Sequence, residues 1–396
     1  MGRHCLQKAV LPALVICALC AASFGQSTIT STFFGIHIKN TTAPLTSNKG
    51  MSFGAWRSLG GGVKWADIET SKGVYNWTRL DTWIADAQQQ GQDIMFTAYA
   101  TPHWASSNPN DLSCTDDQNG GGICDAPKDW NTGDQTWIDF LSALITHVGP
   151  GTIKYYEFWN EIDVQAECAM TTAQLLQLDA DLYNTVHAMD PKALVTSPSI
   201  SELSQGAPQN VLQPYLQAGG SRYADVVAVH GYGGWPPENI SGGITTLKSV
   251  LSNVGMSHLP ILMTEGSWGE QHPIPKSEDV AFVGRYYLLI MSGGIQRFYW
   301  YGWDFPKVDL ISYGKLTDAG IAVQQIMAWT IGQPTPVCTN VGTTYTCVIG
   351  KTTAMWDTQG TPTVTTNQPF YANLEGKTGN VIGGKIQLGA EPILLY

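Results

Sequence analysis

The sequence has few charged side chains and lacks the patterns that define several common classes of protein. Only 13% of its 396 residues are charged, and 32 acidic residues outnumber 21 basic ones. No stretch gathers lysine and arginine into a basic patch, which argues against a nucleic-acid partner. Neither the HExxH motif of zinc proteases nor the GxSxG motif of α/β-hydrolases occurs. Beyond the N-terminal region, no apolar run is long enough to span a bilayer.

The first 25 residues have the layout of a secretory signal peptide. Arg3 and Lys8 precede an apolar run over residues 9–22, and small residues at 23–25 provide a cleavage point near Gly25. A membrane anchor is the alternative, but the apolar run is short for a spanning helix. We therefore predict a secreted protein, extracellular or periplasmic, without a membrane span.

Five of the eight cysteines remain after the signal peptide is removed. Cys114 and Cys124 bracket a loop rich in Gly and Asp, whereas Cys338 and Cys347 bracket a segment typical of a hairpin. None of these five cysteines shows CxxC spacing, and export favours disulfides over metal ligation. These two pairs are predicted to be local disulfides, and Cys168 is predicted to be a free, buried thiol.

Strand-like and helix-like segments alternate through most of the chain. Eight apolar or aromatic segments have strand character, at residues 33–39, 52–57, 93–99, 155–161, 193–198, 226–232, 260–265 and 297–303. Helical patterns follow them at residues 81–90, 136–148, 172–189, 211–218, 244–253, 277–292 and 318–329. Near-continuous apolar strands joined by helices indicate a parallel sheet covered by helices. We predict an α/β fold of the (β/α)8 TIM-barrel type; the alternative, an open doubly wound sheet, lacks a Gly-rich phosphate loop after the first strand.

The composition of the sequence changes from Pro334 onward. Short runs rich in Thr and Gly replace the helical patterns, as expected for a small antiparallel β-domain. The predicted organisation is therefore a signal peptide over residues 1–25, a catalytic barrel over 26–332 and a C-terminal β-domain over 333–396.

Polar and aromatic residues collect where the predicted strands end, which is where a (β/α)8 barrel places its active site. Glu161 and Glu265 end strands four and seven, in apolar surroundings where an unpaired carboxylate is costly. Each is either an ordinary strand-end residue facing solvent or one of a catalytic pair. Two carboxylates flanking a bond are what glycoside hydrolysis requires, because one protonates the leaving oxygen while the other attacks the sugar or activates water. The predicted substrate-binding residues are Arg57, His103, Trp104, Asn160, His230, Tyr232, Trp268, Trp300 and Trp303.

Three segments carry a resemblance to a known group of enzymes. EFWNE on strand four, LMTEGSW on strand seven and WADIETSKGVYNWTRLD after strand two resemble clan A retaining glycoside hydrolases, near the family 39 type. The resemblance covers most of residues 33–330, and the closing PILLY resembles the end of that family's accessory β-domain. It implies Glu161 as general acid/base, Glu265 as nucleophile and carboxyl groups about 5–5.5 Å apart. It also implies that Asn160 contacts the sugar 2-hydroxyl and that Arg57 keeps the nucleophile ionised.

The carbohydrate substrate is left open by these patterns. We predict cleavage of β-linked bonds in an oligo- or polysaccharide; the alternatives are an exo-acting β-glycosidase and a non-catalytic carbohydrate-binding or scaffold protein. The loop at residues 105–134 bears on this choice, because folded over the cleft it would leave only a pocket. His37, His103 and His230 show no metal-ligand spacing, so neither a metal nor another cofactor is expected. Glu157 is predicted to be a structural buried acid.

Overall fold

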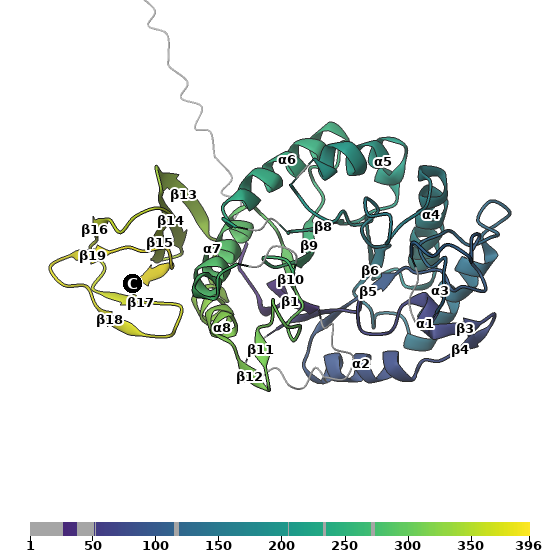
Figure 1. The fold of residues 1–396 in the computed structure, drawn as a ribbon, viewed down its shortest axis with the longest axis horizontal. Coiled ribbons are helices and arrows are strands. Elements are labelled where there is room, and N and C mark those ends of the chain that lie inside the picture. Colours follow the sequence, from purple (N-terminus) through teal and green to yellow (C-terminus); the bar gives the residue numbers. More distant parts are fainter. Residues whose placement is uncertain are drawn as a thin grey trace, which may run out of the picture.

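The computed structural model describes residues 27–37, 51, 53–114, 119–204, 206–232, 235–270 and 274–396. The predicted signal peptide and the end of the first predicted strand lie outside these residues. Two regions are visible in Figure 1: a ring of strands and helices, and a group of antiparallel strands beside α7 and α8.

Eight parallel strands form the barrel, in the order β7-β6-β5-β2-β1-β10-β9-β8. They are β1 (Phe34–His37), β2 (Ala55–Arg57), β5 (Asp93–Ala98), β6 (Tyr155–Phe158), β7 (Leu194–Thr196), β8 (Val227–His230), β9 (Ile261–Gly266) and β10 (Arg297–Tyr301). A parallel bridge between Thr196 and Val226 joins the ends of this order. The predicted (β/α)8 barrel is confirmed, with strands shorter than the apolar segments that encode them.

The longer helices of the barrel surround the strands (Figure 1). They are α2 (Thr78–Gln89), α3 (Gln135–Val148), α4 (Thr172–Met189), α5 (Gln213–Gln217), α6 (Asn239–Asn253), α7 (Asp279–Ser292) and α8 (Asp318–Thr330). The bounds of α4 agree with the prediction because Thr171 and Gln174 form a capping box at its start. Helix α6 begins five residues earlier than predicted, since Gly242 and Gly243 conceal its first turns in the sequence.

Short elements interrupt the strand–helix alternation. After β2 come α1 (Trp65–Ile68) and a hairpin of β3 (Glu69–Ser71) and β4 (Val74–Tyr75). A π-helical turn (Pro208–Leu212) precedes α5. A second hairpin, β11 (Ile311–Ser312) and β12 (Lys315–Leu316), separates β10 from α8. None of these was predicted, because segments of two to four residues carry too little periodicity.

The C-terminal strands form an antiparallel sheet in the order β13-β14-β15-β20-β17-β18. Its strands are β13 (Val337–Val341), β14 (Thr344–Ile349), β15 (Thr352–Asp357), β17 (Phe370–Ala372), β18 (Thr378–Asn380) and β20 (Ile393–Leu395). A separate pair consists of β16 (Thr363–Thr365) and β19 (Lys385–Gln387). This region packs closely on α7, where a Cβ on Gly284 would lie only 2.3 Å from the side chain of Leu374. The predicted boundary at residue 333 falls between α8 and β13.

Both predicted disulfides are present, and Cys168 is a free, buried thiol as predicted. The Cys338–Cys347 bond joins paired positions of β13 and β14. Within the described parts of the chain, no helix combines the length and apolar character needed to cross a membrane.

Candidate active site

The carboxyl ends of the barrel strands bring Glu161 and Glu265 together. Glu265 lies in β9, one residue before that strand ends, and Glu161 follows the end of β6 by three residues. His230 ends β8 and lies beside both. One donor atom from each of these three side chains lies within 4.8 Å of the other two.

A strained turn after β6 positions Glu161. Trp159 and Glu161 have positive φ angles of 50° and 40°, a conformation that residues with a side chain rarely adopt. The turn is held because the indole of Trp159 donates to the carbonyl of Glu167 at 2.9 Å, and the amide of Glu161 donates to Ser199 Oγ at 3.1 Å. Backbone strain of this kind persists where the surrounding structure fixes it, and it is concentrated at functional sites.

Arg57 links three side chains beneath the site. Its Nε donates to Glu157 Oε2 at 2.6 Å, its Nη1 to Glu265 Oε1 at 2.7 Å and its Nη2 to Asn160 Oδ1 at 2.9 Å. Thr97 adds a hydrogen bond to the same oxygen of Glu157 at 2.7 Å. Arg57 and Glu157 are fully buried, so the pair satisfies two charges that would otherwise be costly. Glu157 is thus the structural buried acid that the sequence predicted.

Positive and polar groups surround Glu265. Besides Arg57, His37 Nδ1 lies 3.0 Å from Oε1 and His230 Nδ1 lies 3.2 Å from Oε2. Tyr232 donates its hydroxyl hydrogen to Oε2 at 3.1 Å. Burial acts to raise the pKa of Glu265, but the charges of His230 and Arg57, with His37, hold it well below its usual range. The site therefore keeps this carboxylate ionised.

Glu161 has different surroundings. Its side chain is 17% exposed, compared with 5% for Glu265. Its Oε1 lies 2.7 Å from His230 Nδ1. Burial acts to lower the pKa of His230, but the neighbouring Glu265 and Glu161 raise it above the ordinary value. The two neighbouring carboxylates therefore favour the charged form of the His230 imidazole.

The family of this chain follows from its sequence as well as its fold. Residues 74–322, more than half of the chain, match the family described as glycosyl hydrolase catalytic core. The chain belongs to this glycosyl hydrolase family. No curated protein matches it.

Solved structures similar to this glycosyl hydrolase include members of families 39 and 30. A family 39 glycoside hydrolase from Bacteroides cellulosilyticus WH2 is 16% identical with a TM-score of 0.71, covering 93% of this chain and 82% of that one. A monomeric β-xylosidase from Caulobacter crescentus CB15 is 15% identical with a TM-score of 0.65, covering 93% and 96%. A family 30 endoxylanase from Clostridium papyrosolvens C71 is 13% identical with a TM-score of 0.62, covering 93% and 97%. The predicted likeness to family 39 is confirmed at the level of the fold.

Asn160, a predicted substrate-binding residue, precedes Glu161 in the chain. Its amide oxygen accepts from Arg57, and its Nδ2 donates to Glu167 Oε2 at 3.2 Å. Burial raises the pKa of Glu167, although Asn160 acts in the opposite direction. The amide of Asn160 is thus oriented by partners on both sides, and its contact with a sugar hydroxyl stays a prediction.

Two of the predicted substrate-binding residues lie in the core of the glycosyl hydrolase. Trp300 and Trp303 are 0% exposed, so neither ring offers a face to a sugar. Trp300 stacks on Tyr287 of α7 at 6.1 Å, which shows that it faces the helix layer. Successive side chains of a strand point to opposite sides, so the next residue, Tyr301, faces the mouth. The prediction that Trp300 and Trp303 bind sugar is wrong for this arrangement.

Three other predicted residues have their recorded polar contacts with backbone carbonyls rather than with the two carboxylates. His103 Nδ1 lies 3.1 Å from the carbonyl oxygen of Gly121, in the disulfide-bonded loop. The indole of Trp104 donates to the carbonyl of Glu69 at 2.9 Å. Trp268 is only 5% exposed and packs edge-on against Trp300 at 5.3 Å.

The predicted set of substrate-binding residues omitted His37 and Tyr301. These two are paired across β1 and β10, and their rings meet edge-on at 4.8 Å. The Tyr301 hydroxyl donates to Glu270 Oε1 at 2.8 Å, and its ring lies 6.0 Å from that of Tyr232. Side chains alternate between the two faces of the strand in FYWYGW. Knowing that Trp300 faces the helices would therefore have identified Tyr301 as a residue that faces the site.

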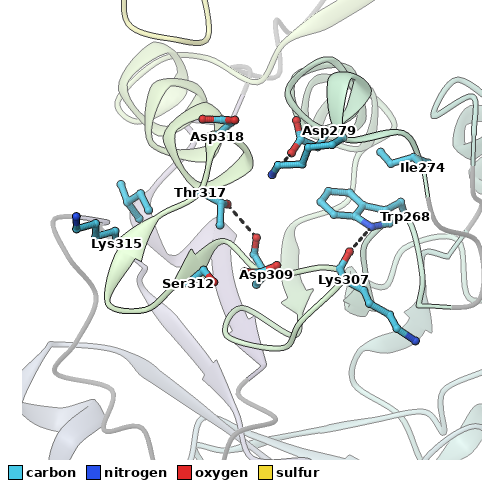
Figure 2. A pocket seen from close by; sticks show the side chains of 11 residues that line it. Trp268, Ile274, Asp279, Lys307, Asp309, Ser312, Lys315, Thr317 and Asp318 are labelled. Atoms are coloured by element: carbon cyan, nitrogen blue, oxygen red, sulfur yellow. Dashed lines mark hydrogen bonds and ion pairs between the residues drawn. The ribbon is translucent and has the colours of Figure 1, made fainter.

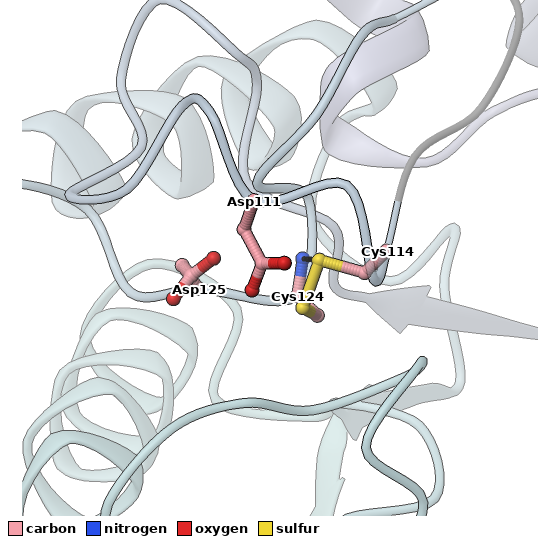
Figure 3. Close-up of side chains that lie close together, drawn as sticks. All are labelled: Asp111, Cys114, Cys124 and Asp125. Carbon is pink, nitrogen blue, oxygen red and sulfur yellow. Dashed lines mark hydrogen bonds between the residues drawn. A yellow bond between two sulfur atoms is a disulfide. The ribbon is translucent and has the colours of Figure 1, made fainter.

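Two groups of side chains have donor atoms close enough for a metal ion, among the residues that the structure describes. The first is Glu161, His230 and Glu265, the site itself. The second is Asp111 and Asp125 beside Cys114 and Cys124 (Figure 3). These two sulfurs are bonded to each other and so are not available as thiolate ligands. Burial and, to a smaller extent, the nearby charge of Asp111 raise the pKa of Asp125 to about 6.

Proposed function

We propose that this glycosyl hydrolase is a retaining enzyme that cleaves β-linked O-glycosidic bonds, with Glu265 as nucleophile and Glu161 as general acid/base. The observation that carries the proposal is their proximity, since donor atoms of the two carboxylates lie within 4.8 Å of each other. Retaining glycosidases place these groups about 5–5.5 Å apart, whereas inverting enzymes leave about 6.5–9.5 Å for a water molecule. The short spacing supports the retaining mechanism.

The charges around Glu265 suit the first step of that mechanism. A carboxylate oxygen attacks the anomeric carbon, and the bond from that carbon to the leaving oxygen breaks. The leaving oxygen takes a proton from Glu161, whose Oε1 lies 2.7 Å from His230 Nδ1. Arg57 favours this step because its ion pair, at 2.7 Å, keeps Glu265 in the ionised form that attacks.

The second step uses the same groups in reverse. Glu161, having lost its proton, accepts one from a water molecule that attacks the anomeric carbon and releases Glu265. The partial exposure of the Glu161 side chain, 17%, supports this exchange because water must reach it. Tyr232, 3.1 Å from Oε2, remains in place to hold the released carboxylate.

Export and substrate class complete the proposal. The predicted signal peptide and the two disulfides support secretion, since disulfides persist in oxidising compartments. Two similar structures are described as a β-xylosidase and an endoxylanase, which makes β-xylosides the first substrates to test. We propose an oligo- or polysaccharide substrate.

Stereochemistry provides the decisive experiment. The enzyme is incubated with a panel of aryl β-glycosides, beginning with the xyloside, and the anomer first released is identified by NMR. We expect β-product, together with covalent labelling of Glu265 by a 2-fluoro glycoside, detected by peptide mass spectrometry. Release of α-product would overturn the retaining mechanism, and absence of turnover on the whole panel would overturn the proposed activity. Activity that persists in EDTA is expected, because the proposed steps use only protein side chains.

Product profiles then separate internal from terminal cleavage. Mixed oligosaccharides early in the digestion of a polysaccharide are expected if several sugar units are bound at once. Monosaccharide alone from the first minutes would favour the exo-acting alternative.

A further inference from the structure

A cavity of about 490 Å³ lies between the loop that follows β9 and the segment that follows β10 (Figure 2). Its volume is within the range of small-molecule sites. Its walls include Trp268, Lys276, Asp309, Ser312, Thr317 and Asp318. Neither Glu161 nor Glu265 lines it, so it is distinct from the catalytic carboxylates.

The cavity is nevertheless beside them. Trp268 follows Glu265 by three residues, and an extended chain of that length spans at most about 11 Å. The indole of Trp268 donates to the carbonyl of Lys307 at 2.7 Å, which ties the two loops together. The cavity therefore opens at the same end of the barrel as the catalytic site, within the length of a substrate that extends past the cleaved bond.

The charges that line the cavity balance. Three are positive and three negative, carried by Lys276, Lys307, Lys315, Asp279, Asp309 and Asp318. Lys276 is already paired with Asp279 at 2.6 Å. In the described part of the chain these carboxylates do not form a cluster with metal-ligand spacing. A balanced lining favours a neutral polar ligand over an anion or a metal ion.

Hydrogen-bonding groups remain available inside this neutral lining. The carboxylates of Asp309 and Asp318 have no hydrogen-bond partner among the described residues. Both lie near Lys276: burial acts to lower the pKa of Lys276, but Asp279 and, to a smaller extent, Asp318 and Asp309 raise it above its usual value. Free carboxylates and hydroxyl groups are features that bind sugars, because sugar hydroxyls donate to carboxylates.

We propose that this cavity is a subsite for a neutral sugar unit of the substrate, separate from the unit whose bond is cleaved. The proposal rests on the proposed function and specifies the length of carbohydrate that the enzyme prefers. The hydroxyls of the sugar donate to Asp309 and Asp318.

The test compares binding with hydrolysis. Asp309→Ala removes one acceptor, and Ser312→Phe fills the cavity without changing any residue that touches the carboxylate pair. Asp86→Ala on α2 is the matched control, since Asp86 and Asp309 are both half-buried acids. Affinities for β-linked xylo-, gluco- and manno-oligosaccharides, from disaccharide to hexasaccharide, are measured by calorimetry in a Glu265→Gln background that prevents turnover.

We expect affinity to rise with chain length in one series and both cavity variants to lose about tenfold or more of that gain. Hydrolysis of an aryl monoglycoside by the same variants, with Glu265 intact, should stay unchanged. Equal affinity for all lengths in every series, or cavity variants that bind long oligosaccharides as well as Asp86→Ala does, would overturn the subsite. Loss of aryl glycoside hydrolysis in the unmodified enzyme would instead contradict the proposed function, so the two failures are distinguishable.

Discussion

The surroundings of Glu265 and Glu161 differ although both residues lie at the same end of the barrel. Glu265 is 5% exposed and contacts an arginine, two histidines and a tyrosine hydroxyl. Glu161 is 17% exposed, and among the described residues its carboxylate has one side-chain partner, His230. The pKa of Glu265 is well below its usual range because these positive groups outweigh burial.

The difference indicates how one kind of side chain performs two tasks. A nucleophile must be ionised before substrate arrives, and fixed charges within a buried site accomplish this. An acid/base residue must exchange a proton twice in each cycle, which requires access to water and a partner that shares the proton. Five substitutions test this contrast.

Replacing Glu265 with alanine should have the largest effect. Activity should fall by roughly 10⁴-fold or more for every substrate, the scale expected when a nucleophile is lost. The measurement is kcat/KM on aryl β-glycosides with good and poor leaving groups. Glu157→Gln, which alters the other carboxylate bound to Arg57, is the control and should retain covalent labelling at Glu265. A similar loss in both variants would mean that Glu265 acts through the buried network rather than as nucleophile.

Glu161→Ala should have an effect that depends on the leaving group. Substrates with poor leaving groups should lose about 10²–10⁴-fold, the usual contribution of general acid catalysis. The first step on good leaving groups should be nearly unaffected because they depart without protonation. Pre-steady-state release of nitrophenol separates that step from hydrolysis of the intermediate. An equal loss for all leaving groups would reverse the assigned roles.

Substitution of Arg57 should destabilise the protein as well as inactivate it. Arg57→Met leaves two buried carboxylates without their cation, which costs about 3–5 kcal/mol in comparable cases. Chemical denaturation gives the free energy of unfolding, with Arg79→Met, an arginine on α2, as the control. A loss below about 1 kcal/mol would show that the two acids become protonated or repack without cost.

His230→Gln should have the smallest effect on stability, and one that depends on pH. The folded pKa of His230 is raised above its ordinary 6.5, so its charged form contributes stability that is fully present below pH 6.5. That contribution is lost as pH rises through the folded pKa. The difference in free energy of unfolding between the two proteins should therefore shrink above pH 6.5. A difference that grows there would mean that His230 is neutral when folded.

Glu265 should make the free energy of unfolding depend on pH in the acidic range. Its folded pKa is depressed, so its ionised form contributes stability above the ordinary value of 4.5, and the contribution is lost as pH falls through the folded pKa. As pH falls from 4.5 through the folded pKa of Glu265, the free energy of unfolding should therefore decrease less in a Glu265→Gln variant than in the unmodified protein.

The barrel could be predicted from sequence because each strand and helix carries its own local signal. Apolar runs mark the strands, and the capping box of α4 marks a helix start to the residue. Barrel architecture then requires the strand ends to meet, so Glu161 and Glu265 could be selected before any coordinates were known.

Only the tertiary structure decided which aromatic residues face the mouth and how the carboxylates differ. Trp300 and Trp303 are larger than Tyr301, yet the orientation of β10 buries both tryptophans and leaves Tyr301 beside His37. The three hydrogen bonds of Arg57 join residues about a hundred or more positions apart. Such contacts have no local pattern, because they depend on the register and direction of strands that meet only when the barrel closes.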